Sequence, residues 1–133
     1  MKKLRSFQVL LFFALLLTAC GGNGPSTRLN VEMSDFKYDM MVYSVPAGQE
    51  ITMKVKNDGA VVHEFVIMKY GLTIGDDFGP EDEDNIYWEV EVEPGESKTV
   101  TFTAPSDTGE YEVVCGTEGH FKAGMASKLI VVE

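Results

Sequence analysis

Three side chains with metal-binding chemistry recur at five-residue intervals near the C-terminus. Cys115, His120 and Met125 lie in the stretch YEVVCGTEGHFKAGM, and four residues separate each of them from the next. The only other histidine of the chain, His63, lies in the apolar stretch VVHEFVI. A thiolate and a thioether favour soft metal ions, and imidazole binds both copper and zinc. The residue types therefore indicate a site for a soft metal ion.

Each donor alone has an ordinary structural explanation. His63 could be a satisfied core histidine, Cys115 a small buried apolar residue and Met125 core filling. Together the four match the two imidazoles, one thiolate and weak axial methionine that bind type 1 copper. Zinc could use the cysteine and both histidines, but its sites add a fourth strong ligand or a catalytic water, and methionine is neither. Copper is therefore the predicted metal.

The local sequence indicates how the donors could reach one point. Alternation in GEYEVVC places Cys115 in the inward-facing register at the end of a strand. The following loop contains Gly116, Gly119 and Gly124, and glycine tolerates the positive φ angles of tight turns. His63 would come from a neighbouring strand, so that the metal would lie between sheet and loop.

The rest of the domain is typical of a β protein. EITMKVKN and SKTVTFTA alternate apolar and polar residues with period 2, as strands buried on one side do. Strands are predicted at 29–36, 41–45, 50–57, 61–69, 86–92, 97–104, 109–115 and 127–132. Seven or eight short strands predict an all-β fold, an antiparallel β-sandwich with Greek-key connections.

The N-terminus has the pattern of an export signal. Basic residues at 2, 3 and 5 precede an apolar run over 7–17, which is too short to span a bilayer comfortably. Its end, Leu-Thr-Ala-Cys, resembles the lipobox of bacterial lipoproteins, which implies cleavage before Cys20 and a lipid on its thiol. The alternative is an ordinary signal peptide. The predicted organisation is a signal peptide at 1–19, a lipid-anchored tether at 20–28 and one domain at 29–133.

Charge narrows the range of partners. Cleavage before Cys20 would leave 8 of the 11 basic residues and all 21 acidic ones, so the net charge would change from −10 to −13. Nucleic acid is not an expected partner, since phosphate binding needs clustered Lys and Arg. Six acidic residues lie within GDDFGPEDEDN, at 76, 77, 81, 82, 83 and 84. This segment could be a solvated loop, a docking patch for a basic partner, or a calcium site, although its spacing is not that of an EF-hand.

The sequence resembles the cupredoxins. CGTEGHFKAGM matches their Cys–His–Met ligand loop, with spacing most like that of auracyanin and rusticyanin, and VVHEFVI resembles the strand that carries their first histidine. The resemblance implies one type 1 copper ion held by His63, Cys115, His120 and Met125, and a one-electron shuttle on the outer side of a bacterial membrane. One departure is Glu64, which stands where many cupredoxins have Asn.

The resemblance also implies a route for the electron. His120 would lie near the surface, with Phe121, Ala123 and Gly124 forming part of an apolar docking face. The partner would be a redox protein such as a cytochrome or respiratory complex with a basic docking face. The chain itself is not expected to be an enzyme, because an oxidase or nitrite reductase would need further histidines. Copper storage or delivery, and a structural or sensory module, remain the alternative functions.

Overall fold

The computed structural model describes residues 24–133, so that the predicted signal peptide and Cys20 lie outside the described part. This part contains nine strands and one 3-10 helix, η1 (Glu83–Asn85). The strands are β1 (Arg28–Ser34), β2 (Lys37–Tyr38), β3 (Val42–Pro46), β4 (Glu50–Asn57), β5 (His63–Met68), β6 (Ile86–Val92), β7 (Ser97–Thr103), β8 (Gly109–Val114) and β9 (Ala126–Val132). Between residues 24 and 133, no helix has the length and apolar character needed to cross a bilayer.

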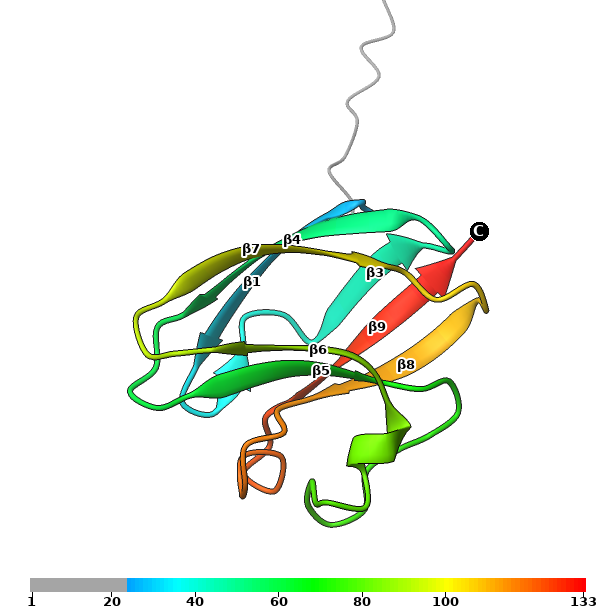
Figure 1. Cartoon of the computed structure of the whole chain (residues 1–133). Coiled ribbons are helices and arrows are strands. Elements are labelled where there is room, and N and C mark those ends of the chain that lie inside the picture. The colour runs from blue at the N-terminus through cyan, green and yellow to red at the C-terminus, as the bar shows by residue number, and fades with distance from the viewer. Residues whose placement is uncertain (1–23) are drawn as a thin grey trace, which may run out of the picture.

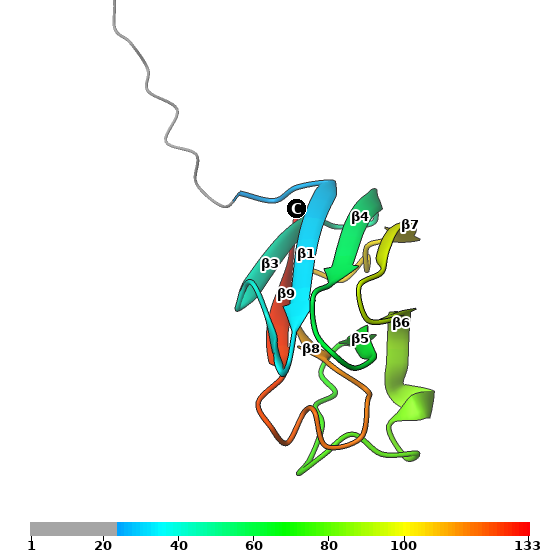
Figure 2. The same ribbon diagram turned by 90° about the vertical axis from the view of Figure 1, so that its left-hand side faces the viewer.

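The strands form two facing sheets (Figures 1 and 2). One has the order β2-β1-β4-β7 and the other β3-β9-β8-β5-β6. The predicted β-sandwich is therefore confirmed, but its pairings are not all antiparallel, since β1–β4 and β3–β9 are parallel. The chain crosses to the second sheet for β3 and returns to the first for β4. This crossing lets β1 and β4 pair as parallel neighbours.

Strand positions follow the period-2 pattern closely. β6 has the predicted bounds, and every second residue of β4 is buried. The structure adds β2, which the sequence analysis did not predict because two residues are too few to show a period. Its Tyr38 is buried, and the hydroxyl donates a hydrogen bond of 2.7 Å to the carbonyl oxygen of Glu64. This short strand thus contacts the segment that carries His63.

The main core lies between the sheets and extends to the predicted metal donors. Apolar residues from the inner faces of both sheets form it, and Cys115 and Met125 belong to the same cluster. Burial of alternate residues on facing sheets is the usual way in which a sandwich removes apolar surface from water. Two of the four predicted donors are therefore part of the packed core itself.

A second, smaller cluster covers the outer face of the five-stranded sheet. Val66, Met68 and Val114 are buried there beneath Ile74 and Phe78. The last two residues belong to the segment between β5 and β6, which also contains the acidic run. This segment is therefore not simply a solvated loop, because its apolar side chains close the sheet.

The two ends of the sandwich differ in what they carry. Residues 115–125, called the donor loop below, connect β8 to β9 and lie at one end (Figures 1 and 2). β1 begins at the opposite end, near the C-terminus, and runs toward the donor loop. The turn from β1 to β2 therefore lies at the same end as the donors.

Candidate metal centre

Two neighbouring strands position the histidine and the cysteine. His63 is the first residue of β5, and Cys115 directly follows β8. The two strands pair antiparallel, with Val66 opposite Val114. The start of β5 and the end of β8 therefore lie at the same edge of the sheet, which brings side chains 52 residues apart in sequence to one place.

The nitrogen and sulfur atoms of three predicted donors converge. His63 Nδ1 lies 3.2 Å from His120 Nδ1 and 3.9 Å from Cys115 Sγ. The third separation, from Cys115 Sγ to His120 Nδ1, is 3.3 Å. All three residues are buried, and only His120 retains some exposure, at 7%. They form one compact donor triangle inside the protein.

This triangle has the size and chemistry that a single metal ion requires. Metal bonds to imidazole nitrogen and thiolate sulfur run about 2.0–2.3 Å, so donors around one ion stand about 3–4 Å apart. Two imidazoles and one thiolate are the in-plane donors of type 1 copper. The residues present therefore fit such an ion without rearrangement of the chain.

Main-chain hydrogen bonds close the donor loop on itself. The Cys115 N–H donates to the Met125 carbonyl over 3.2 Å, and the Met125 N–H donates to the His120 carbonyl over 3.0 Å. Met125 is fully buried in the same core cluster as Cys115. All three loop donors are thus held at the end of the β8–β9 ladder.

Two glycines and one aspartate shape the interior of this loop. Gly119 and Gly124 have φ of +79° and +100°, values that favour glycine, in agreement with the predicted tight turns. The Asp77 carboxylate accepts hydrogen bonds from the N–H groups of Gly119, at 3.1 Å, and Lys122, at 3.3 Å. Sequence reasoning placed Asp77 only in an acidic run, but its carboxylate fastens the loop on both sides of His120.

His63 has a partner on each side of its ring. Its Nδ1 faces the other donors, and its Nε2 lies 2.8 Å from Oδ1 of Asp35, in the turn between β1 and β2. The Ala60 N–H lies 3.2 Å from Oδ1 and 3.0 Å from Oδ2 of the same carboxylate. Hydrogen bonds from Ala60 first, and then from His63, hold the pKa of Asp35 below its ordinary value. No sequence pattern pointed to Asp35.

Burial shifts the pKa values of His120 and Cys115. It is the largest cause that lowers the pKa of His120, followed by the nearby His63, and this favours the neutral imidazole that can bind a metal. Burial likewise raises the pKa of the Cys115 thiol, although hydrogen bonds from the Glu64 N–H and from the hydroxyl and N–H of Thr117 oppose it. A metal cation would supply the missing stabilisation of the thiolate.

Comparison with known proteins agrees with this geometry. A family model described as a cupredoxin-like domain matches residues 7–131. The chain belongs to the cupredoxin-like family. It is 32% identical to auracyanin-A of Chloroflexus aurantiacus over an alignment 152 positions long, which covers 92% of this chain and 93% of that protein. The predicted resemblance to the cupredoxins is thereby confirmed.

Two solved structures share the same architecture. Reduced auracyanin from Roseiflexus castenholzii has a TM-score of 0.69 at 31% identity, with 83% of this chain and 100% of the other covered. The "blue" copper protein auracyanin A from Chloroflexus aurantiacus has a TM-score of 0.61 at 30% identity, with 79% and 99% covered. The similarity extends over almost the whole of both auracyanins.

Glu64, the departure from the usual cupredoxin Asn, still links the two donor segments. Its main-chain N–H donates to Cys115 Sγ over 3.3 Å. Its carboxylate lies against Gly116, where an added Cβ would overlap Oε2. Gly116 does not have a positive φ, which corrects the reason given for it from the sequence; instead it leaves the space that the Glu64 carboxylate occupies. Burial, followed by repulsion from Glu89 and Glu91, raises the pKa of Glu64.

An aromatic ring covers the outer side of the candidate centre in this cupredoxin. Phe36 lies edge-on to His120, with 4.7 Å between ring centroids, and is 44% exposed. It follows Asp35 in the β1–β2 turn, so adjacent residues contact the two histidines. Sequence reasoning predicted Phe121 beside His120, but it did not predict that an N-terminal turn supplies a second aromatic residue.

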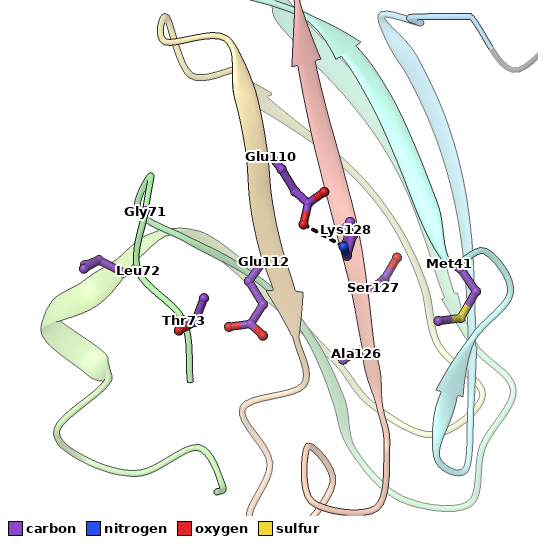
Figure 3. Close-up of a pocket in the computed structure, with 9 residues that line it drawn as sticks. All are labelled: Met41, Gly71, Leu72, Thr73, Glu110, Glu112, Ala126, Ser127 and Lys128. Carbon is purple, nitrogen blue, oxygen red and sulfur yellow. Dashed lines mark ion pairs between the residues drawn. The ribbon is translucent and has the colours of Figure 1, made fainter. Parts of the chain in front are cut away.

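A separate groove lies on the outer face of the five-stranded sheet (Figure 3). It has a volume of about 260 Å³ and lies between Met41 and the segment 71–73, above β8 and β9. Its charged groups are already paired: Glu110 with Lys128 at 2.7 Å, and Glu112 with the Ile74 N–H, also at 2.7 Å. It shares no residue with the donor triangle and offers no reactive group.

Proposed function

We propose that this protein is a type 1 copper electron carrier that acts outside the cytoplasm. The single copper cofactor predicted from the sequence is confirmed by the family match together with the buried donor triangle. That triangle is the observation on which the proposal rests. Copper storage or delivery has no comparable support, because the donors are buried and their loop is fastened at both ends.

His63 Nδ1, Cys115 Sγ and His120 Nδ1 would hold the copper ion, together with Met125 as a weaker ligand. The separations of 3.2–3.9 Å between the first three atoms support this set. Burial of Met125 beside Cys115, through their main-chain bond, supports its assignment. Bound copper would supply a one-electron change of oxidation state that needs no chemical change in the protein.

The protein would hold the donors in place and keep water away from the metal. The donor loop is held by the β8–β9 ladder and by Asp77, and His63 is held at the start of β5. Donors that are already in place need little rearrangement when the charge of the site changes, and their burial keeps water away from the metal. This arrangement suits electron transfer, and we infer that the chain transforms no substrate of its own.

The electron would cross the surface near His120. Its imidazole retains slight exposure, and the exposed Phe36 lies against it. We propose that Phe36 and Phe121 form the apolar contact with a redox partner. A contact that excludes water would shorten the electron path between the copper site and the redox centre of the partner. Charged groups farther away would then guide the encounter.

An absorption spectrum of the copper-loaded domain tests the proposed carrier. We expect an intense visible band from charge transfer between the thiolate and Cu(II), which disappears on reduction and returns on reoxidation. A colourless protein that exchanges Cu(I) rapidly would instead indicate storage or delivery. A protein that binds no copper would refute both functions.

A basic redox protein is the proposed partner. Asp76, Glu81, Glu83 and Asp84 are exposed, whereas Asp77 and Asp82 accept hydrogen bonds from main-chain N–H groups. Replacing Asp76, Glu81 and Glu83 by their amides should slow reduction by a basic cytochrome at low salt and flatten its salt dependence. The control replaces the exposed acidic residues Glu50, Asp107 and Glu133 in the same way. Equal rates for the two variants would reject this docking role.

Export and a lipid anchor on Cys20 complete the proposal. The basic start, the apolar run and the Leu-Thr-Ala-Cys motif support them. Mass spectrometry of the N-terminal peptide from the membrane fraction of the producing bacterium tests this. We expect a diacylated Cys20 at the new N-terminus, and a Cys20→Ala variant that no longer remains with the membrane. An unmodified cysteine in the exported protein would exclude the anchor.

A further inference from the structure

The turn between β1 and β2 brings a carboxylate to the first histidine of the candidate centre. Because His63 Nδ1 faces the other donors, the proton of a metal-binding His63 must sit on Nε2, 2.8 Å from Asp35 Oδ1. An N–H at this position donates to the carboxylate, which has no proton to give. The contact therefore selects the tautomer that leaves Nδ1 free for a metal.

Asp35 is itself held in place for this contact. The Ala60 N–H lies within hydrogen-bonding distance of both carboxylate oxygens. Ala60 belongs to the turn between β4 and β5, which the buried Asn57 braces. The Asn57 amide donates to the carbonyls of Val61 and Val92 at 2.8 and 2.9 Å, and its oxygen accepts the Gly59 N–H at 2.8 Å. A turn adjacent to β5 thus fixes the carboxylate.

Gly59 leaves the space in which the two groups meet. A Cβ at this position would overlap Asp35 Oδ1 and would lie 2.7 Å from His63 Nε2. The φ of Gly59 is not positive, so backbone conformation does not require glycine here. What requires it is the close approach of a carboxylate and an imidazole.

We propose that Asp35 is the positioning residue of the metal centre, which fixes the tautomer and orientation of His63 and stabilises the oxidised state of the bound metal. The second part rests on the proposed copper function. A fixed negative charge hydrogen-bonded to a ligand favours the more positive state of the site. Asp35 therefore lowers the reduction potential.

Four variants separate the charge of Asp35 from its contact. Asp35→Asn removes the charge and keeps an acceptor oxygen, whereas Asp35→Ala removes both. Gly59→Ala keeps the charge and forces the carboxylate away from His63. Asp58→Asn is the control. It removes one charge from the β4–β5 turn that contains Gly59, where Asp58 forms an exposed ion pair with Lys56 at 2.6 Å.

Nitrogen-15 NMR of the copper-free protein tests the positioning directly. In the wild type we expect His63 to carry its proton on Nε2, and in Asp35→Ala and Gly59→Ala we expect a mixture of both tautomers. The Asp58→Asn control should match the wild type. A wild-type proton on Nδ1, or an unchanged tautomer in Asp35→Ala, would overturn the proposal whether or not the protein binds copper.

Potentiometry of the copper-loaded protein tests the electrostatic part. Asp35→Asn should reduce the preference for the oxidised ion by about tenfold, which corresponds to a rise of about 59 mV in the one-electron potential. Asp58→Asn should shift it less. Equal shifts in these two variants would overturn the specific role of Asp35, whereas a wild type that binds no copper would overturn the proposed function instead.

Discussion

The two parts of the candidate metal centre are held in different ways. Cys115, His120 and Met125 come from one loop, whose ends are joined by main-chain hydrogen bonds. His63 depends on contacts from three places outside the donor loop: Asp35 in the β1–β2 turn, Tyr38 in β2 through Glu64, and the adjacent turn braced by Asn57. The donor loop is thus a local unit, whereas His63 has a distributed support from the first half of the domain. A substitution that disturbs one of the two should leave the other intact.

Cys115→Ser should have the largest effect, because it removes the soft donor of the local unit. We expect the visible band to disappear and the copper affinity to fall by more than about 100-fold. This loss exceeds the one typical for residues that hydrogen-bond to a ligand without touching the metal. Absorption spectroscopy and copper titration measure both. The free energy of unfolding of the copper-free protein should change little by comparison. An intact visible band would show that Cys115 is not a ligand.

Asn57→Ala should break the distributed support. The buried carbonyl oxygen of Val92 and the partly buried one of Val61 lose their donor, so the free energy of unfolding should fall by about 2–5 kcal/mol. Denaturant unfolding of the copper-free domain measures the loss, with Asp58→Asn as the control on the adjacent surface position. A loss no greater than that of the control would mean that the amide does not brace this turn.

Asp77→Ala should loosen the local unit without removing a donor. The N–H groups of Gly119 and Lys122 lose a charged acceptor, which corresponds to about 1–3 kcal/mol of local stability. Hydrogen exchange at these two amides should accelerate, while amides of β5 should remain protected. Asp76→Ala, at the exposed neighbouring position, is the control, and equal exchange in both variants would contradict the bracing role.

Met125→Leu should have the smallest effect on the protein, because the two side chains have similar volumes and the swap costs less than about 1.5 kcal/mol. Copper should remain bound, and the reduction potential should rise because a weak donor is lost. Met68→Leu, in the outer cluster, is the matched control and should leave the potential unchanged. An empty site in Met125→Leu would mean that the thioether is a principal ligand.

The difference between the two regions also explains what the sequence could predict. The donor loop is contiguous, and its rare residue types stand out in a chain with two histidines. The strand predictions, three of them from period-2 alternation, include every strand except the two-residue β2. The parallel pairings were not visible, because they depend on where the chain crosses between the sheets.

The supporting residues left no comparable signal. Asp35 lies 28 residues before His63 in an ordinary turn sequence, and Asp77 was indistinguishable from the acidic residues around it. Gly59 indicated a turn, yet the structure assigns it a steric role. Such contacts arise only when distant turns meet in the folded chain, so residue types and spacing cannot identify them.

The position of the donor loop at the end opposite the start of β1 determines how the protein can exchange electrons (Figures 1 and 2). The seven residues of β1 span about 23 Å at roughly 3.3 Å per residue. A chain attached to a bilayer through Cys20 would therefore carry its candidate metal centre at the end of the domain opposite the attachment. A redox partner fixed in the same bilayer would meet it through a part that projects from the membrane, or when the tether lets the domain turn over.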